Sequence, residues 1–93
     1  MSDLYSHRCN QMKHIQNTAY ELFEKKNKDY GDAFATYGTI GVIVRIGDKI
    51  NRLININENN INLVDDEKME DTLLDLHNYA ALALILLTEK NNK

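Results

Sequence analysis

The stretch TIGVIVRIGDKINRLI, residues 39–54, decides the fold, because its apolar residues recur with the period of an α-helix. The apolar side of that helix carries Val42, Ile43, Ile46, Ile50, Leu53 and Ile54. At about 100° per residue, one arc of the other side carries Arg45, Asp48, Lys49 and Arg52. The stretch therefore predicts an amphipathic helix with a charged stripe of three cations and one acid.

The rest of the chain favours long helices as well. Its 93 residues include no proline and four glycines, and 43% of them are hydrophobic, so residues that break helices are scarce. We expect helices over about 3–28 and 39–55, and a third from Asp65 or Asp66, either a good N-cap, to about residue 89. An ordered loop, KDYGDAFATYG (28–38), and a polar linker, NINENNINLV (55–64), should separate them. The predicted fold is all-α, with three helices in a single domain, residues 1–93; a short extra turn forming a fourth helix is the alternative.

The segment YAALALILL, residues 79–87, is apolar on every face of the third predicted helix. A helix of that kind has to be surrounded, and the other two helices of a short chain cannot easily do so. We therefore expect a homo-oligomer, a dimer or larger, that completes the bundle. The segment has nine residues, whereas a membrane-spanning helix needs about 20, so a membrane is not an expected partner.

Composition and charge limit the cellular compartments and the binding partners that we expect. The single cysteine, Cys9, cannot form an internal disulfide, and residues 1–16 lack the apolar core of a signal peptide. We expect a cytoplasmic protein, in the host cytoplasm if it is viral; the many Asn, Lys and Ile residues are typical of an AT-rich genome, such as that of a phage. The net charge is −3, and neither half of the chain has a dense basic patch. Duplex nucleic acid is therefore not an expected partner.

The third predicted helix carries a polar face of its own. In EDTLLDLHNYA, residues 70–80, Asp71, Asp75 and Asn78 project from a single face. Two carboxylates one turn apart repel each other, so something should compensate for their charge. A divalent metal such as Mg²⁺ would do so. The cationic stripe of residues 45–52 would also do so, by ion pairing between helices, and the sequence leaves both alternatives open.

Three segments carry a resemblance to a known family. KKNKDYGDAF, GTIGVIVRIGDKINRL and MEDTLLDLHNYAALAL resemble the nucleotide-modification-associated domain family of phages and bacteria, over about residues 20–87. That family is in turn similar, more distantly, to the all-α nucleotide pyrophosphohydrolases of the MazG and dimeric dUTPase type. The resemblance implies a MazG-like helical dimer or tetramer. It also implies Mg²⁺ held on E-x-x-E and E-x-x-D motifs, and cleavage of a nucleoside triphosphate to the monophosphate and pyrophosphate.

The acidic motifs of those enzymes are only partly present. Asp75 resembles the aspartate that ends the second motif, but Asp71 stands one residue before the position of that motif's glutamate. Asp48 resembles one acid of the first motif, and Arg52 lies where another acid is expected. An E-x-x-E does occur at residues 21–24, on the first predicted helix. The resemblance thus implies a retained phosphate-binding character and an incomplete set of metal ligands.

These observations predict a polar pocket between helices. The candidate nucleotide- or phosphate-binding residues are Lys49, Arg52, Arg45, Asn78, Tyr30 and Lys28. The candidate ligands of Mg²⁺ are Asp71, Asp75 and Asp48, and no catalytic residue is assigned. The competing interpretation is a solvated helix face with ion pairs, a turn anchored by Tyr30 and a solvated lysine at the helix end.

The predicted function is therefore nucleotide binding by a Mg²⁺-dependent protein of the pyrophosphohydrolase kind. Whether the protein is an enzyme is left open, since the metal-ligand motif is incomplete. The alternative is a phage protein without turnover that sequesters a nucleotide second messenger of antiviral defence. A purely structural helical oligomer is a third interpretation.

Overall fold

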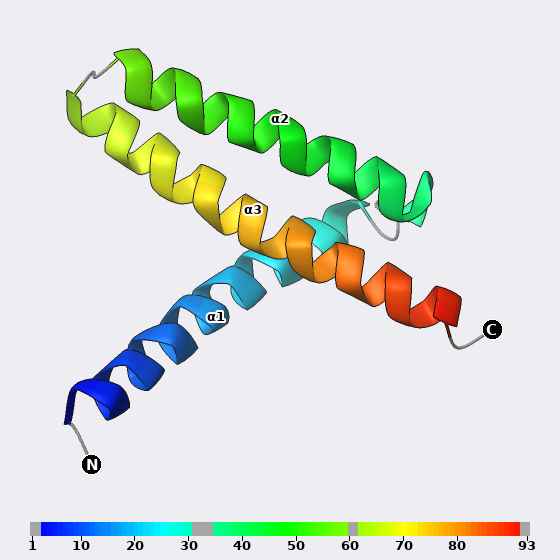
Figure 1. The fold of residues 1–93 in the computed structure, drawn as a ribbon, viewed down its shortest axis with the longest axis horizontal. Coiled ribbons are helices and arrows are strands. Elements are labelled where there is room, and N and C mark those ends of the chain that lie inside the picture. The colour runs from blue at the N-terminus through cyan, green and yellow to red at the C-terminus, as the bar shows by residue number, and fades with distance from the viewer. Residues whose placement is uncertain (1–2, 31–34, 60–61, 92–93) are drawn as a thin grey trace. The chain divides into compact units, whose positions relative to one another are not determined.

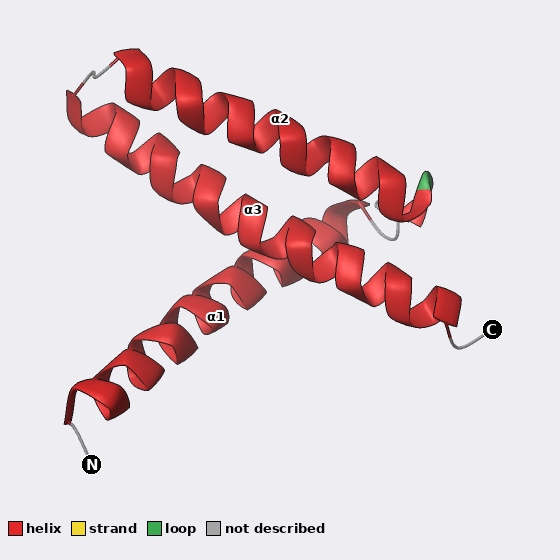
Figure 2. Ribbon diagram, viewed as in Figure 1, coloured by secondary structure: helices red, strands yellow, loops and turns green. Residues whose placement is uncertain are grey.

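The computed structural model describes residues 3–30, 35–59 and 62–91, apart from the side chains of residues 28–30, 57–59 and 62–68. It consists of three helices, α1 (Asp3–Tyr30), α2 (Gly38–Asn59) and α3 (Asn62–Asn91) (Figure 1). In these ranges every element is a helix and no strand occurs (Figure 2). The predicted all-α fold is therefore confirmed.

The helices extend further than the sequence predicts. Helix α1 continues to Tyr30, α2 continues to Asn59, and α3 already begins at Asn62. The predicted linker over residues 55–64 and the predicted start of the third helix at Asp65 or Asp66 are thus wrong. Extending an existing helix costs far less than nucleating one, and each Asn weakens it by only a fraction of a kcal/mol, so the Asn-rich segment does not end the helices where the pattern predicted.

The start of α2 shows a specific use of glycine. Gly38 has φ of 67°, in the left-handed region that glycine adopts without a steric penalty. The turn before it places the carbonyl oxygen of Tyr37 3.4 Å from the amide nitrogen of Gly41, which donates a hydrogen bond to it. The chain thereby enters α2 through a tight turn.

The chain divides into two compact units. The first, Met1–Gly31, contains α1, and the second, Asp32–Lys93, contains α2 and α3. Within the second unit α2 and α3 lie side by side and run antiparallel, joined at one end (Figure 1). The single domain over residues 1–93 and the bundle completed by further copies stay predictions.

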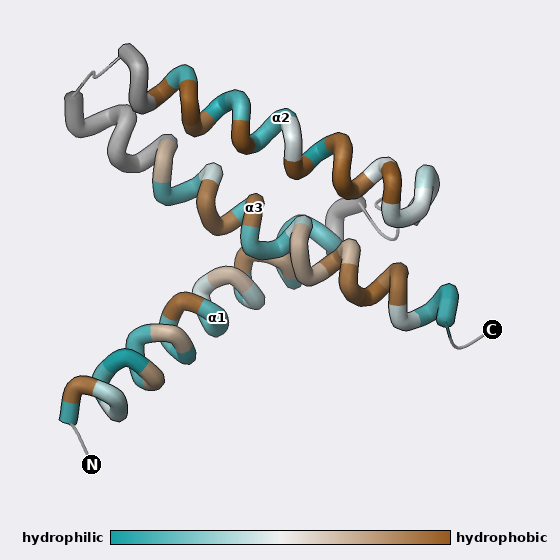
Figure 3. The backbone as a smooth tube through the Cα atoms, viewed as in Figure 1, coloured by the Kyte–Doolittle hydropathy of each residue, from teal (hydrophilic) through white to brown (hydrophobic). Residues whose placement is uncertain are grey.

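Apolar side chains of the α2–α3 pair are partly buried and partly exposed. Val42 on α2 and Leu82 on α3 are buried. Hydrophobic and hydrophilic residues alternate turn by turn along α2, as the periodicity predicted (Figure 3). In the apolar segment 79–87, however, Leu84 is 65% exposed and Leu87 is exposed as well.

A helix that crosses a membrane has to be both long and apolar. Among the described residues, none of the helices combines the length and the apolar character needed to cross a bilayer.

Candidate functional site: a polar cluster on the α2–α3 pair

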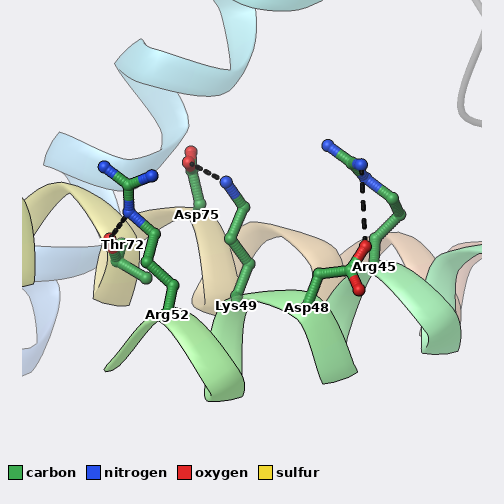
Figure 4. A network of polar contacts seen from close by, with 6 residues as sticks. All are labelled: Arg45, Asp48, Lys49, Arg52, Thr72 and Asp75. Atoms are coloured by element: carbon green, nitrogen blue, oxygen red, sulfur yellow. Dashed lines mark hydrogen bonds and ion pairs between the residues drawn. The ribbon is translucent and has the colours of Figure 1, made fainter. Parts of the chain in front are cut away.

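The charged stripe of α2 meets a row of polar residues on α3. We call the residues in contact the α2–α3 polar cluster: Arg45, Asp48, Lys49, Arg52, Thr72, Asp75 and Tyr79. Figure 4 shows six of them, with the α2 side chains projecting to the side on which Thr72 and Asp75 lie. Helical spacing explains the gathering, since residues three and four apart share a face.

The ion pair between Lys49 and Asp75 lies at the middle of the cluster. Lys49 Nζ is 3.3 Å from Asp75 Oδ2, and the two side chains are only 20% and 17% exposed. Charges that are shielded from water to this degree interact more strongly than surface pairs. Ion pairing between helices, one of the two ways of compensating the α3 acids, is thus present for Asp75.

Arg52 makes the second contact between the helices. Its Nε donates a hydrogen bond of 3.1 Å to the hydroxyl oxygen of Thr72, which is 2% exposed. The guanidinium of Arg52 itself lies on the exposed side. One edge of its planar fork is therefore anchored, and the remaining N–H groups belong to the class of donors that bind a phosphate bidentately.

Arg45 makes the third contact, at the other end of the cluster. Its guanidinium carbon is 5.9 Å from the centre of the Tyr79 ring, the outer limit of a cation–π interaction. A hydrogen bond with Tyr79 and then charge interactions with Tyr79, Asp48 and Asp75 raise the pKa of Arg45 above its ordinary value, although burial opposes this. Arg45 also forms a surface pair with Asp48 at 3.8 Å, in which the side chains are 57% and 60% exposed.

The three contacts between the helices follow one register. Arg45, Lys49 and Arg52 are successive turns of α2, and each step along α2 is matched by an equal step backwards on α3, from Tyr79 through Asp75 to Thr72. Antiparallel helices that keep a constant register give this pattern. The cluster is therefore one continuous row, and Val42 and Leu82, both buried, are the next positions along it.

The other predicted site residues either have no part in the three contacts described above or have side chains outside the described residues. Asp71 is exposed on α3. Asn78 is half-buried, with its Oδ1 3.1 Å from Nδ1 of the neighbouring His77. Lys28 and Tyr30 belong to the backbone of α1, but their side chains lie outside the described residues.

The predicted ligands of Mg²⁺ are not gathered as a metal site would need. Asp75 faces Lys49, and Asp48 faces Arg45, so each of these carboxylates has a cation beside it. Throughout the described part of the chain, no three acidic, histidine or cysteine residues come together to hold an ion. The magnesium site therefore stays a prediction.

Sequence reasoning missed two members of the cluster. Thr72 and Tyr79 were not predicted, because threonine at a buried position and tyrosine at the start of an apolar segment both look like core residues. The spacing contained a usable signal, since residues 72, 75 and 79 lie on one helix face. Asn78, which was predicted in their place, is the neighbour of Tyr79 in the chain.

The cluster is suited to holding an anion. Three basic side chains lie along one row, two carboxylates neutralise them in part, and one hydroxyl and one aromatic ring complete the set. Guanidinium and ammonium groups that are already held by hydrogen bonds lose less freedom when an anion binds.

Comparison with known proteins bears on the same segment. The family model described as nucleotide modification associated domain 1 matches residues 26–87, more than half of the chain and a range that includes the whole polar cluster. No curated protein and no solved structure matches the chain.

Proposed function

Because the chain belongs to the nucleotide modification associated domain 1 family, we propose that it binds a nucleotide, and that the α2–α3 polar cluster holds the phosphate groups. The observation that carries the proposal is the anchored Arg52, whose Nε is fixed to the buried hydroxyl of Thr72. A guanidinium held in this way presents the rest of its fork in a fixed orientation, which favours bidentate recognition of phosphate.

Charge supports the same proposal. Arg45, Lys49 and Arg52 bring three positive charges, and Asp48 and Asp75 return two negative ones, so the row keeps a net positive charge. A nucleotide is a polyanion and would complete the neutralisation. Binding would also let a phosphate compete with Asp75 for Lys49.

Binding without turnover is the form of this function that the contacts favour. Two of the three candidate metal ligands, Asp48 and Asp75, are each placed against a cation. Sequestration of a nucleotide, including a nucleotide second messenger of antiviral defence, needs the cations and no metal. The hydrolase alternative is supported by the spacing of Asp71 and Asp75, acids on adjacent turns of α3.

One experiment tests both forms. The purified protein is incubated with a panel of ribonucleotides, deoxyribonucleotides and cyclic dinucleotides, once with Mg²⁺ and once with a chelator. Mass spectrometry then scores retention on the protein and cleavage separately. We expect at least one nucleotide to be retained intact under both conditions. Cleavage in the Mg²⁺ samples alone would support the hydrolase, and no retention of any nucleotide would overturn the proposed function.

A further inference from the structure

The two ends of the polar cluster differ in chemistry. At one end, Arg52 contacts the neutral hydroxyl of Thr72. At the other end, Arg45 lies beside the aromatic ring of Tyr79. A guanidinium nitrogen of Arg45 is also 3.8 Å from a carboxylate oxygen of Asp48. A ligand with an anionic group at one end and an aromatic ring at the other would match the two ends of the row.

From this asymmetry, and resting on the proposed function, we infer a binding polarity: the base stacks at Tyr79 and Arg45, and the phosphates bind at Arg52. Tyr79 is then a residue that decides specificity for nucleotides over plain phosphate chains. Aromatic rings and guanidinium planes are the groups on which bases stack, and they do so for any base.

The charges of the described residues give the direction. Arg45 shares its surroundings with two acids, because Asp48 pairs with it and Asp75 acts on it electrostatically. Arg52 makes its contact with a group that carries no charge. An anion is thus attracted more strongly to the Arg52 end. A neutral ring is not repelled by the two acids near Arg45, so it can lie at the Arg45 end.

The length of the row agrees with a nucleotide lying along it. Arg45 and Arg52 are two turns apart on α2, which corresponds to about 10 Å at 1.5 Å per residue. A base bound at the first residue therefore reaches the second only through its sugar and phosphates. Lys49, between them, can contact the phosphate nearest the sugar once that phosphate displaces Asp75.

The test compares ATP with inorganic tripolyphosphate, which has the same phosphate chain and no base. Isothermal titration calorimetry measures both affinities for the native protein and for three variants, Tyr79→Leu, Tyr79→Phe and Tyr37→Leu. The last is the matched control, since Tyr37 lies in the same unit, is 84% exposed and is outside the cluster. We expect Tyr79→Leu to weaken ATP about tenfold and to leave tripolyphosphate unchanged, because one stacked base is lost. Tyr37→Leu should keep both affinities. Tyr79→Phe keeps the aromatic ring and loses only the hydroxyl that contacts Arg45, so it should weaken ATP less than Tyr79→Leu does.

A second measurement uses the native chain and does not depend on how well a variant folds. Nuclear Overhauser effects from the adenine protons of bound ATP should reach the Tyr79 ring, while Arg52 signals should shift with both ATP and tripolyphosphate. Equal affinity for the two probes, or an equal loss for both in Tyr79→Leu, would overturn the inferred polarity and leave the proposed function intact. Absence of binding by both probes, together with failure of the nucleotide panel, would overturn the proposed function itself.

Discussion

At the scale of single residues, the exposed fraction of the two side chains decides how much an ion pair contributes to stability. The Arg45–Asp48 pair is more than half exposed, and pairs of that kind contribute about 0–1 kcal/mol to stability. The Lys49–Asp75 pair is about one fifth exposed, so its loss should be felt in both stability and binding. Arginine is protonated at physiological pH, and the surroundings of Arg45 raise its pKa further, so this end of the cluster keeps its positive charge.

Replacing Arg52 by alanine should weaken nucleotide binding by about 1.5–3 kcal/mol, the range for hydrogen bonds to charged groups. The helices should persist, because the side chain contributes one hydrogen bond to Thr72 and is otherwise exposed. Calorimetry measures the affinity, and circular dichroism checks the fold. Arg8→Ala is the control, since Arg8 is an exposed arginine of α1 bonded only locally to Gln11. Unchanged affinity in Arg52→Ala would support the competing interpretation, in which the charged stripe is a solvated helix face.

Replacing Asp75 by asparagine separates the binder from the metal enzyme. If Asp75 neutralises Lys49, the variant frees a positive charge, and affinity for a nucleotide should rise by a few-fold while stability falls by about 1–3 kcal/mol. Asp71→Asn, at an exposed position one turn away, should change neither.

A metal site predicts the opposite outcome. Both Asp71→Asn and Asp75→Asn should then abolish cleavage and weaken Mg²⁺-dependent binding. Titrations in Mg²⁺ and in chelator distinguish the two outcomes directly, since an ion pair is indifferent to the chelator.

Sequence reasoning at this scale identified the stripe of α2 and its partner Asp75, because charged residues at helical spacing on an apolar helix are conspicuous. It did not identify Thr72 or Tyr79. The contacts of a threonine hydroxyl and a tyrosine ring with the other helix can be predicted only when the register of the two helices is known, and the periodicity of a single helix contains no information on register.

At the scale of elements, α2 depends on glycines that play different parts. A Cβ at Gly41 would lie 2.6 Å from the Cβ of Tyr37, a contact that a side-chain rotation cannot relieve. A Cβ at Gly47 would meet no atom within 4 Å. The close approach of the turn to the first part of α2 therefore requires Gly41, whereas Gly47 only weakens the helix.

The two glycines give opposite predictions for the same change. Gly47→Ala should stabilise the protein by about 1 kcal/mol, because alanine favours a helix interior over glycine. The melting temperature should rise by about 4–8 °C, as expected for a domain of this size. Gly41→Ala should lower the melting temperature, because the turn must shift to make room for the methyl group. Thermal denaturation followed by circular dichroism measures both, and a rise in both variants would contradict the close approach at Gly41.

The existence and type of all three helices could be predicted from the sequence, since the periodicity is strong and proline is absent. The ends could not. Residues 55–64 have the composition of a linker, yet α2 continues through Asn59 and α3 begins at Asn62. Asparagine is tolerated in an extended helix at a small cost, so composition alone does not locate the end.

At the scale of the whole molecule, the apolar segment 79–87 is not fully covered. Leu84, Ile85 and Leu87 are all exposed in the single chain. Exposed aliphatic side chains on consecutive turns favour association with a further copy. The oligomer predicted from the sequence therefore remains our expectation.

Leu84→Glu should dissociate the predicted oligomer or unfold the chain, because it would place a charge in an apolar interface at a cost of several kcal/mol. Light scattering measures the mass, and Asn51→Glu, at an exposed polar position of α2, is the control with the same added charge. A native protein that scatters as a folded monomer of 10.7 kDa would contradict the prediction.

The row shared by α2 and α3 also bears on how firmly the two helices are locked against sliding. A slip of α3 by one turn would bring Asp71 to the place of Asp75 and Asp75 to the place of Tyr79, so Lys49 and Arg45 would each face an acid. The same slip would bring Lys68 to the place of Thr72, where it would face Arg52. Two contacts of the row would thus pair a cation with an acid and one would gain a repulsion, so charge alone distinguishes the two registers only weakly. The same slip would also bring Asn78 to the place of Leu82, beside the buried Val42. Burying the amide of an asparagine against an apolar side chain removes its hydrogen bonds to water and costs free energy. The burial of Val42 and Leu82 at the end of the row therefore favours the described register of α2 against α3. The contacts of the charged side chains depend on that register.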